Sequence, residues 1–135
     1  MPDYTLSTTV QRGYEETVQA VRESLAEAGF GVLTEIDLQA VLKAKLDVDV
    51  APQIILGACR PQLAHQALQA DPSIAALLPC NVVVRAADDT TTIVEAFDPD
   101  AMMSFAGASG SDVLGTVAAD ARQRLQTALT SLEND

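Results

Sequence analysis

Two short apolar segments in the second half of the chain are the feature that most constrains its fold. Residues 81–86 and 91–97 place valine, isoleucine or alanine at alternate positions, and Ala87-Asp88-Asp89-Thr90 joins them. Alternating apolar and polar residues are typical of a strand with one buried face, and a short polar connection between two such segments predicts a β-hairpin. The sheet therefore contains at least one antiparallel pair of strands.

The apolar faces of this hairpin also predict its register. Val84 opposite Val94 and Val82 opposite Ala96 gives one continuous apolar face. A shift by one residue would place Glu95 on that face, at the expense of burying a charge.

This register makes a prediction about the end of the sheet. It sets Cys80 opposite Asp98 on the buried side, where Cβ atoms of cross-strand neighbours lie roughly 5 Å apart. Met102 and Met103 follow about one helical turn later, so we expect them to lie above the same end.

The remaining patterns predict three more strands and three or four helices. The predicted strands are 4–10, 30–36 and 53–59, and the predicted helices are 15–28, 38–45, 62–70 and 112–132, with a short helical turn at 73–78. Asp37 is expected to cap the second helix, whose Leu38, Val41 and Leu42 are expected to face inward. This order predicts a single α+β domain over residues 1–135, and the C-terminal helix is long enough to cross a whole sheet face.

An acidic charge balance narrows the possible functions. The formal net charge is −11, which disfavours nucleic-acid binding, because that requires a basic surface. No apolar run approaches the roughly 20 residues of a membrane span, and the N-terminus has no basic segment followed by an apolar stretch, as a secretory signal has. We therefore expect a cytoplasmic protein with reduced cysteines that binds neither nucleic acid nor membrane.

Residues 57–81 hold both cysteines and the one histidine of the chain. These residue types carry out soft-metal and thiol chemistry at neutral pH. Cys59 ends one predicted strand and Cys80 begins another. If the two strands are antiparallel neighbours, both cysteines lie at the same end of the sheet; if they are parallel, they lie at opposite ends. The residues themselves leave both arrangements open.

Three ordered motifs resemble the Domain of Unknown Function 302 family: 29–37 (GFGVLTEID), 56–59 (LGAC) followed by Pro61, and 77–84 (LLPCNVVV). The resemblance covers nearly the whole chain. It implies a two-layer fold similar to the TATA-box-binding-protein-like class, with a largely antiparallel, curved sheet packed against helices, often as a homodimer. It also favours the same-end arrangement of Cys59 and Cys80. Asp47 departs from the pattern, since a glycine would suit the turn better.

A metal site and a thiol-redox site are both chemically conceivable here. Cys59, His65 and Cys80 could bind Zn²⁺ or Cu⁺, with Asp98 or Met102 as a fourth ligand, although the spacing is not a standard zinc pattern. Cys59 precedes a helix N-terminus beside Arg60, and both features are expected to lower a thiol pKa. Against both hypotheses, two cysteines of this kind are often plain core residues, and His65 falls on the solvent side of its helix.

Paired carboxylates at strand ends suggest a third chemistry. Glu35 and Asp37 follow one strand, and Asp98 and Asp100 follow another. Such pairs can act as a general acid and base. We favour the alternative, in which Asp37 and Asp98 or Asp100 cap helices and Pro99 occupies a first helical turn.

Two functions of different classes follow. We favour a small-ligand-binding or interaction module that acts as a homodimer, with a site at the sheet end formed by Cys59, Cys80, Asn81 and Asp98. Asn81 points away from the apolar face, so its amide is free to bind a ligand or cap a loop. The alternative is a thiol-redox or soft-metal-handling protein that uses Cys59 and Cys80. The sequence specifies neither a cofactor nor a reaction.

Overall fold

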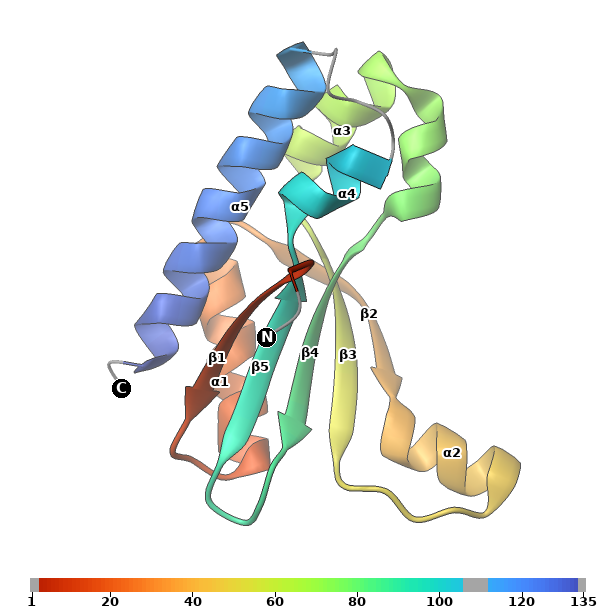
Figure 1. Cartoon of the computed structure of the whole chain (residues 1–135), viewed down its shortest axis with the longest axis vertical. Coiled ribbons are helices and arrows are strands. Elements are labelled where there is room, and N and C mark those ends of the chain that lie inside the picture. The colour runs from red at the N-terminus through yellow and green to blue at the C-terminus, as the bar shows by residue number, and fades with distance from the viewer. Residues whose placement is uncertain (1–2, 106–111, 134–135) are drawn as a thin grey trace.

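The computed structural model describes residues 3–105 and 112–133, which form a five-stranded sheet and the helices packed on it (Figure 1). The strands are β1 (Thr5–Val10), β2 (Gly31–Asp37), β3 (Gln53–Cys59), β4 (Cys80–Ala86) and β5 (Thr92–Phe97). The helices are α1 (Tyr14–Glu27), α2 (Leu38–Leu46), α3 (Pro61–Ala70), the 3₁₀ helix η1 (Pro72–Leu77), α4 (Pro99–Phe105) and α5 (Asp112–Glu133). The predicted elements are therefore confirmed to within a few residues at their ends.

The strands are arranged in the order β1-β5-β4-β3-β2, and each neighbouring pair is antiparallel. In the β4–β5 hairpin, Val82 pairs with Ala96 and Val84 with Val94. The predicted register is therefore confirmed, and its reason is visible in the burial: these four side chains are buried while Glu95 lies on the other face. The chain has a two-layer α+β fold with a largely antiparallel sheet.

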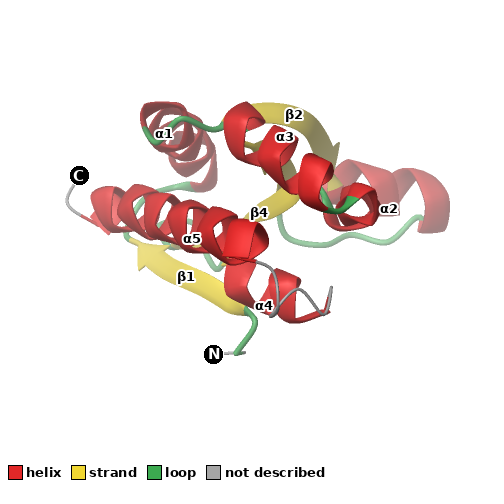
Figure 2. Cartoon of the chain, turned by 90° about the horizontal axis from the view of Figure 1, so that it is seen from above, coloured by secondary structure: helices red, strands yellow, loops and turns green. Residues whose placement is uncertain are grey.

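Helices α1 and α5 cover one face of the sheet (Figure 2). Their apolar stripes pack on the buried positions of the central strands, and this main core includes Leu25 of α1, Leu56 of β3 and Leu125 of α5. Burial of such side chains contributes about 1.5–3 kcal/mol each to folding. The opposite face of the sheet carries a row of half-buried or exposed apolar side chains, in which Ile36, Ile55 and Val83 are aligned across β2, β3 and β4.

A smaller second core lies above the sheet, at the end where β3 and β5 finish and β4 begins. Ala67 of α3, Ile74 of η1, and Leu114 and Val117 of α5 form its buried part. Figure 1 shows α3, α4 and the upper part of α5 gathered at this end. We call it the upper end of the sheet.

At the lower end, α2 stands apart from the rest of the molecule (Figure 1). Asp37 caps this helix as predicted, because its carboxylate accepts a hydrogen bond of 3.0 Å from the backbone N–H of Ala40. The expectation that Leu38, Val41 and Leu42 face inward is only weakly met. All nine residues of α2 remain exposed or half-buried, because the helix lies beyond the end of β2 and the start of β3 instead of over the sheet.

Across the described ranges, no helix is both long and apolar enough to cross a membrane.

Candidate functional site

Both cysteines lie at the upper end of the sheet. Because β3 and β4 are antiparallel and Ala58 pairs with Cys80, Cys59 at the end of β3 and Cys80 at the start of β4 lie at the same end of the sheet. The topology thus decides the question that the sequence left open, in favour of the arrangement that the family resemblance implied.

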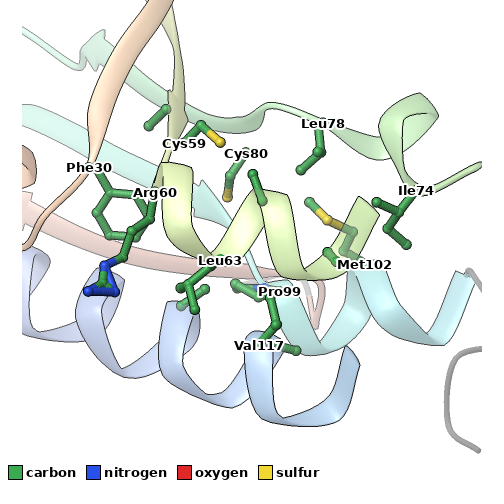
Figure 3. A pocket seen from close by; sticks show the side chains of 15 residues that line it. Phe30, Cys59, Arg60, Leu63, Ile74, Leu78, Cys80, Pro99, Met102 and Val117 are labelled. Atoms are coloured by element: carbon green, nitrogen blue, oxygen red, sulfur yellow. The ribbon is translucent and has the colours of Figure 1, made fainter. Parts of the chain in front are cut away.

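The two cysteines line a pocket with a cavity volume of about 60 Å³. Figure 3 shows that residues of several elements surround it, with Cys59 and Cys80 next to each other and Met102 of α4 on the same cavity. Apart from Arg60, the two thiols and the Met102 thioether, the described lining is hydrocarbon: Phe30, Ala58, Leu63, Ala64, Ala67, Ile74, Leu78, Pro99, Val117, Ala118 and Ala121.

The pocket lies at the seam between the two cores. Cys80 and Met102 belong to the main core, whereas Ala67, Ile74 and Val117 belong to the second one. The main core is built on a sheet and the second on helices. Short side chains at the seam, among them alanines of α3 and α5, leave space where larger residues would have filled it.

Gly57 allows the segment that precedes Cys80 to pack closely against β3. A Cβ atom at Gly57 would lie 2.7 Å from Pro79 Cγ, and still closer to Thr34 Oγ1. Only a residue without a side chain allows Pro79 to pack directly on β3. Since Pro79 immediately precedes Cys80, this close approach fixes where the Cys80 thiol enters the pocket.

Both thiols are held in their protonated form. Burial raises the pKa of Cys80 to about 12, and the nearby Cys59 and Asp98 add to the effect. The Cys80 thiol donates a hydrogen bond of 3.4 Å to the backbone carbonyl of Phe97. Burial also raises the pKa of Cys59. The expectation that Arg60 and the helix N-terminus lower the Cys59 pKa is therefore wrong in direction, because desolvation outweighs them.

The other predicted site residues do not join the pocket. Asn81 pairs with Gly57 on the opposite face of the sheet, where it lines an open depression with Val83 and Arg85. Its predicted orientation is confirmed, but it cannot act together with the thiols. Asp98 lies beside Cys80, yet its carboxylate is already engaged. It accepts a 2.9 Å hydrogen bond from the backbone N–H of Asp100 and pairs with Arg122 at 3.3 Å.

His65 is exposed on α3, on the side predicted to face solvent. Within residues 3–105 and 112–133, no group of three or more histidine, cysteine, aspartate and glutamate side chains is arranged to hold a metal ion. A zinc site built from Cys59, His65, Cys80 and Asp98 is therefore not formed, because the histidine and the carboxylate point elsewhere.

The carboxylate pairs have structural roles. Glu35 forms an ion pair of 2.9 Å with Arg22 of α1, Asp37 caps α2, and Asp98 accepts from the first turn of α4. The preference for helix capping over acid–base catalysis agrees with these contacts.

A cluster of charges at the mouth of the pocket was not foreseen. Arg60 lies 3.5 Å from Asp120 of α5, which also pairs with Arg124 at 3.0 Å. Arg124 donates to the backbone carbonyl of Ala28 at 3.1 Å. Arg60 Nε is buried and has no hydrogen-bond partner in the described part of the chain. The Asp120–Arg124 spacing of four residues is visible in the sequence, but the approach of Arg60 depends on tertiary structure.

Comparisons with known proteins show the family to which the chain belongs. A family model, "Domain of unknown function DUF302", matches residues 6–132. The chain belongs to this family. A crystal structure of an uncharacterized conserved DUF302 protein from Bacillus stearothermophilus is similar over 98% of this chain and 100% of its own, with a TM-score of 0.85 and 28% identity. Among curated proteins, none matches the chain.

Proposed function

We propose that this protein is a small-ligand-binding module whose ligand occupies the pocket between Cys59, Cys80 and Met102. The observation that carries the proposal is the sulfur-lined cavity at the seam of two otherwise packed cores. Empty space in a protein interior loses dispersion contacts and is normally filled. A cavity with two thiols and a thioether on its wall is therefore a candidate for occupation.

The size of the cavity restricts what it accepts. A volume of about 60 Å³ is far below the roughly 300–1,000 Å³ of pockets that bind organic cofactors or drug-sized ligands. It is also below the roughly 150 Å³ of an engineered cavity that binds benzene. The ligand is therefore an ion or a group of a few atoms, and extended substrates and nucleotide cofactors do not fit.

The test is to look for the ligand on protein purified anaerobically without an affinity tag. Native and elemental mass spectrometry should detect a bound species in the wild-type protein. Ala118→Val adds two methyl groups to a buried side chain on the pocket wall and should remove that species. Ala119→Val makes the same change on the exposed side of α5 and should retain it. A wild-type protein with no bound species, or one retained by Ala118→Val, would contradict the proposal.

We further propose that the module is a homodimer that associates through the arm, which we define as residues 33–50. Among the described residues, five of the seven exposed large apolar side chains lie in this arm: Leu33, Ile36, Leu46, Val48 and Val50. The arm includes most of edge strand β2, whose free backbone edge can pair with the same edge of a second copy about a two-fold axis.

Sedimentation velocity tests this part of the proposal. Leu46→Glu should convert the dimer to a monomer, because Leu46 is among the most exposed apolar residues of the arm. Val113→Glu places the same charge on an exposed apolar position of α5 and should leave the dimer intact. A monomeric wild-type protein, or equal effects of both substitutions, would argue against association through the arm.

A thiol-redox function is less well supported. The thiolate is the reactive form of cysteine, and the pKa of both thiols is raised. Both thiols should therefore react slowly with oxidants and disulfides at neutral pH.

A further inference from the structure

We propose that the ligand of this pocket is a single Cu⁺ ion bound by the thiolates of Cys59 and Cys80, with the thioether of Met102 as a third, weaker ligand. This inference rests on the proposed function, since it names the occupant of the same site.

The three sulfur atoms come from three elements that the fold brings together. Cys59 ends β3, Cys80 begins the neighbouring strand β4, and Met102 lies in α4, which follows β5. Figure 3 shows the side chains of Cys59 and Cys80 next to each other, and Met102 lines the same pocket. Methionine has three rotatable bonds, so its sulfur can move toward an ion without displacing the helix that carries it.

The chemical nature of the wall selects the ion. Thiolate and thioether donors favour Cu⁺, whereas Mg²⁺, Ca²⁺ and Mn²⁺ favour carboxylate and carbonyl oxygen. The described pocket lining contains no carboxylate and no imidazole. Structural Zn²⁺ takes four ligands in a tetrahedron, and this wall offers three sulfurs. Cu⁺ accepts two or three soft ligands, which is the number available.

The surroundings also suit a reduced, soft ion. The hydrocarbon wall limits the access of water, and the volume of about 60 Å³ has room for an ion but not for an organic cofactor. On binding, the two thiols lose their protons to solvent, because a coordinated thiol is deprotonated outright. The copper ion keeps its oxidation state. Two thiolates and one Cu⁺ leave a single negative charge. Arg60, with its buried and unpartnered Nε, is the charged residue on the described wall.

The experiment is an anaerobic titration of the whole protein with Cu⁺ in competition with bathocuproine disulfonate. The wild-type protein should bind one equivalent. Cys59→Ser and Cys80→Ala should each weaken binding by at least about 100-fold, and Met102→Leu by about 10-fold. His65→Ala removes the exposed histidine and should leave the affinity unchanged. Because Cys80 is buried, circular dichroism should establish that each variant is folded before its affinity is interpreted.

Copper K-edge X-ray absorption gives a second readout that needs no variant. It should show a first shell of sulfur atoms only. Failure of the wild-type protein to retain Cu⁺ would overturn the inference, as would equal affinity in the cysteine variants or nitrogen and oxygen ligands in the spectrum.

The outcome for Cu⁺ can be separated from that of the proposed function. If Ala118→Val removes a co-purifying species that is not copper, and the wild-type protein does not bind Cu⁺, the inference fails while the small-ligand function remains. If the wild-type protein carries no species and does not bind Cu⁺, both fail.

Discussion

The upper end of the sheet and the arm differ in how their apolar residues are used. At the upper end, Ile74 of η1 is 1% exposed and belongs to a buried cluster with residues of α3 and α5. In the arm, Leu46 is 66% exposed. Both regions connect strands of the same sheet through a helix, yet one encloses a cavity and the other presents apolar surface to its surroundings.

This difference shows that the two ends of the sheet are suited to different tasks. A small cavity with a mostly apolar wall gives selectivity for an ion or a small group, because few contacts are possible and each must match. An exposed apolar surface next to a free sheet edge favours association with another chain. The proposed ligand site and the proposed dimer surface therefore lie at opposite ends of the sheet.

The largest expected effect contrasts apolar truncations at the two ends. Ile74→Ala should lower the free energy of unfolding by about 2–5 kcal/mol, because it creates a cavity in the second core. Leu46→Ala should change it by less than about 0.5 kcal/mol in dilute solution. Urea unfolding monitored by circular dichroism measures both. A large loss at Leu46 that grows with protein concentration would show that a second copy covers it.

A second comparison uses glycines. Gly57→Ala should destabilise the protein by about 1–3 kcal/mol, because the new Cβ collides with Pro79 and Thr34. Gly115→Ala, in α5, meets nothing within 4 Å and should stabilise by about 0.5–1 kcal/mol through helix propensity. Thermal unfolding distinguishes the two. Equal changes in thermal stability for the two substitutions would mean that the packing of Pro79 on β3 does not require glycine at position 57.

The buried thiol predicts a loss of stability at alkaline pH. The pKa of the Cys80 thiol is near 9 in the unfolded chain and about 12 in the folded protein. Its contribution to the free energy of unfolding is therefore fully present below pH 9. Above pH 9 the unfolded state releases the proton first, and the stability difference between the wild type and Cys80→Ala should fall by about 1.4 kcal/mol for each pH unit. Urea unfolding between pH 8 and 11 tests this. A difference that stays constant over that range would contradict the burial of the thiol.

The smallest expected effect is in the arm. Asp47 ends α2 with a φ of 53°, in the left-handed region where glycine is favoured. Asp47→Gly should stabilise the protein by about 0.5 kcal/mol, because relief of the backbone outweighs loss of the exposed Lys43–Asp47 pair. Asp49→Gly also removes an exposed partner of Lys43, and it should not stabilise. Thermal unfolding is the measurement, and stabilisation by both would point to surface charge instead of backbone geometry.

Much of the fold was predictable because it depends on local patterns. The alternation in 81–97 predicts the hairpin and its register, and Asp37 is recognisable as a helix cap. In α5, the buried residues Leu114, Val117 and Leu125 also follow helical spacing. Each of these features depends on residues close together in the sequence, so the spacing carries the information.

The candidate site was predictable only in part. Cys59 and Cys80 were identified by residue type and by their positions at strand ends, but the sequence grouped Asn81 with them. Neighbouring residues of a strand point to opposite faces, which separates Asn81 from Cys80. The direction of the Cys59 pKa shift was predicted wrongly, because the desolvation that raises this pKa depends on tertiary packing.

Periodicity and residue type are local properties, so the elements, the hairpin register and the two residues with thiol chemistry could be recognised from the sequence. Three further features required the three-dimensional fold: β3 and β4 are antiparallel neighbours, two cores meet at a small cavity, and α2 stands free of the sheet. These outcomes depend on contacts between distant segments, such as Pro79 on Gly57 and α5 over the upper end. At these contacts, strand pairing and side-chain packing must be compatible with each other, and a local sequence pattern does not encode that requirement.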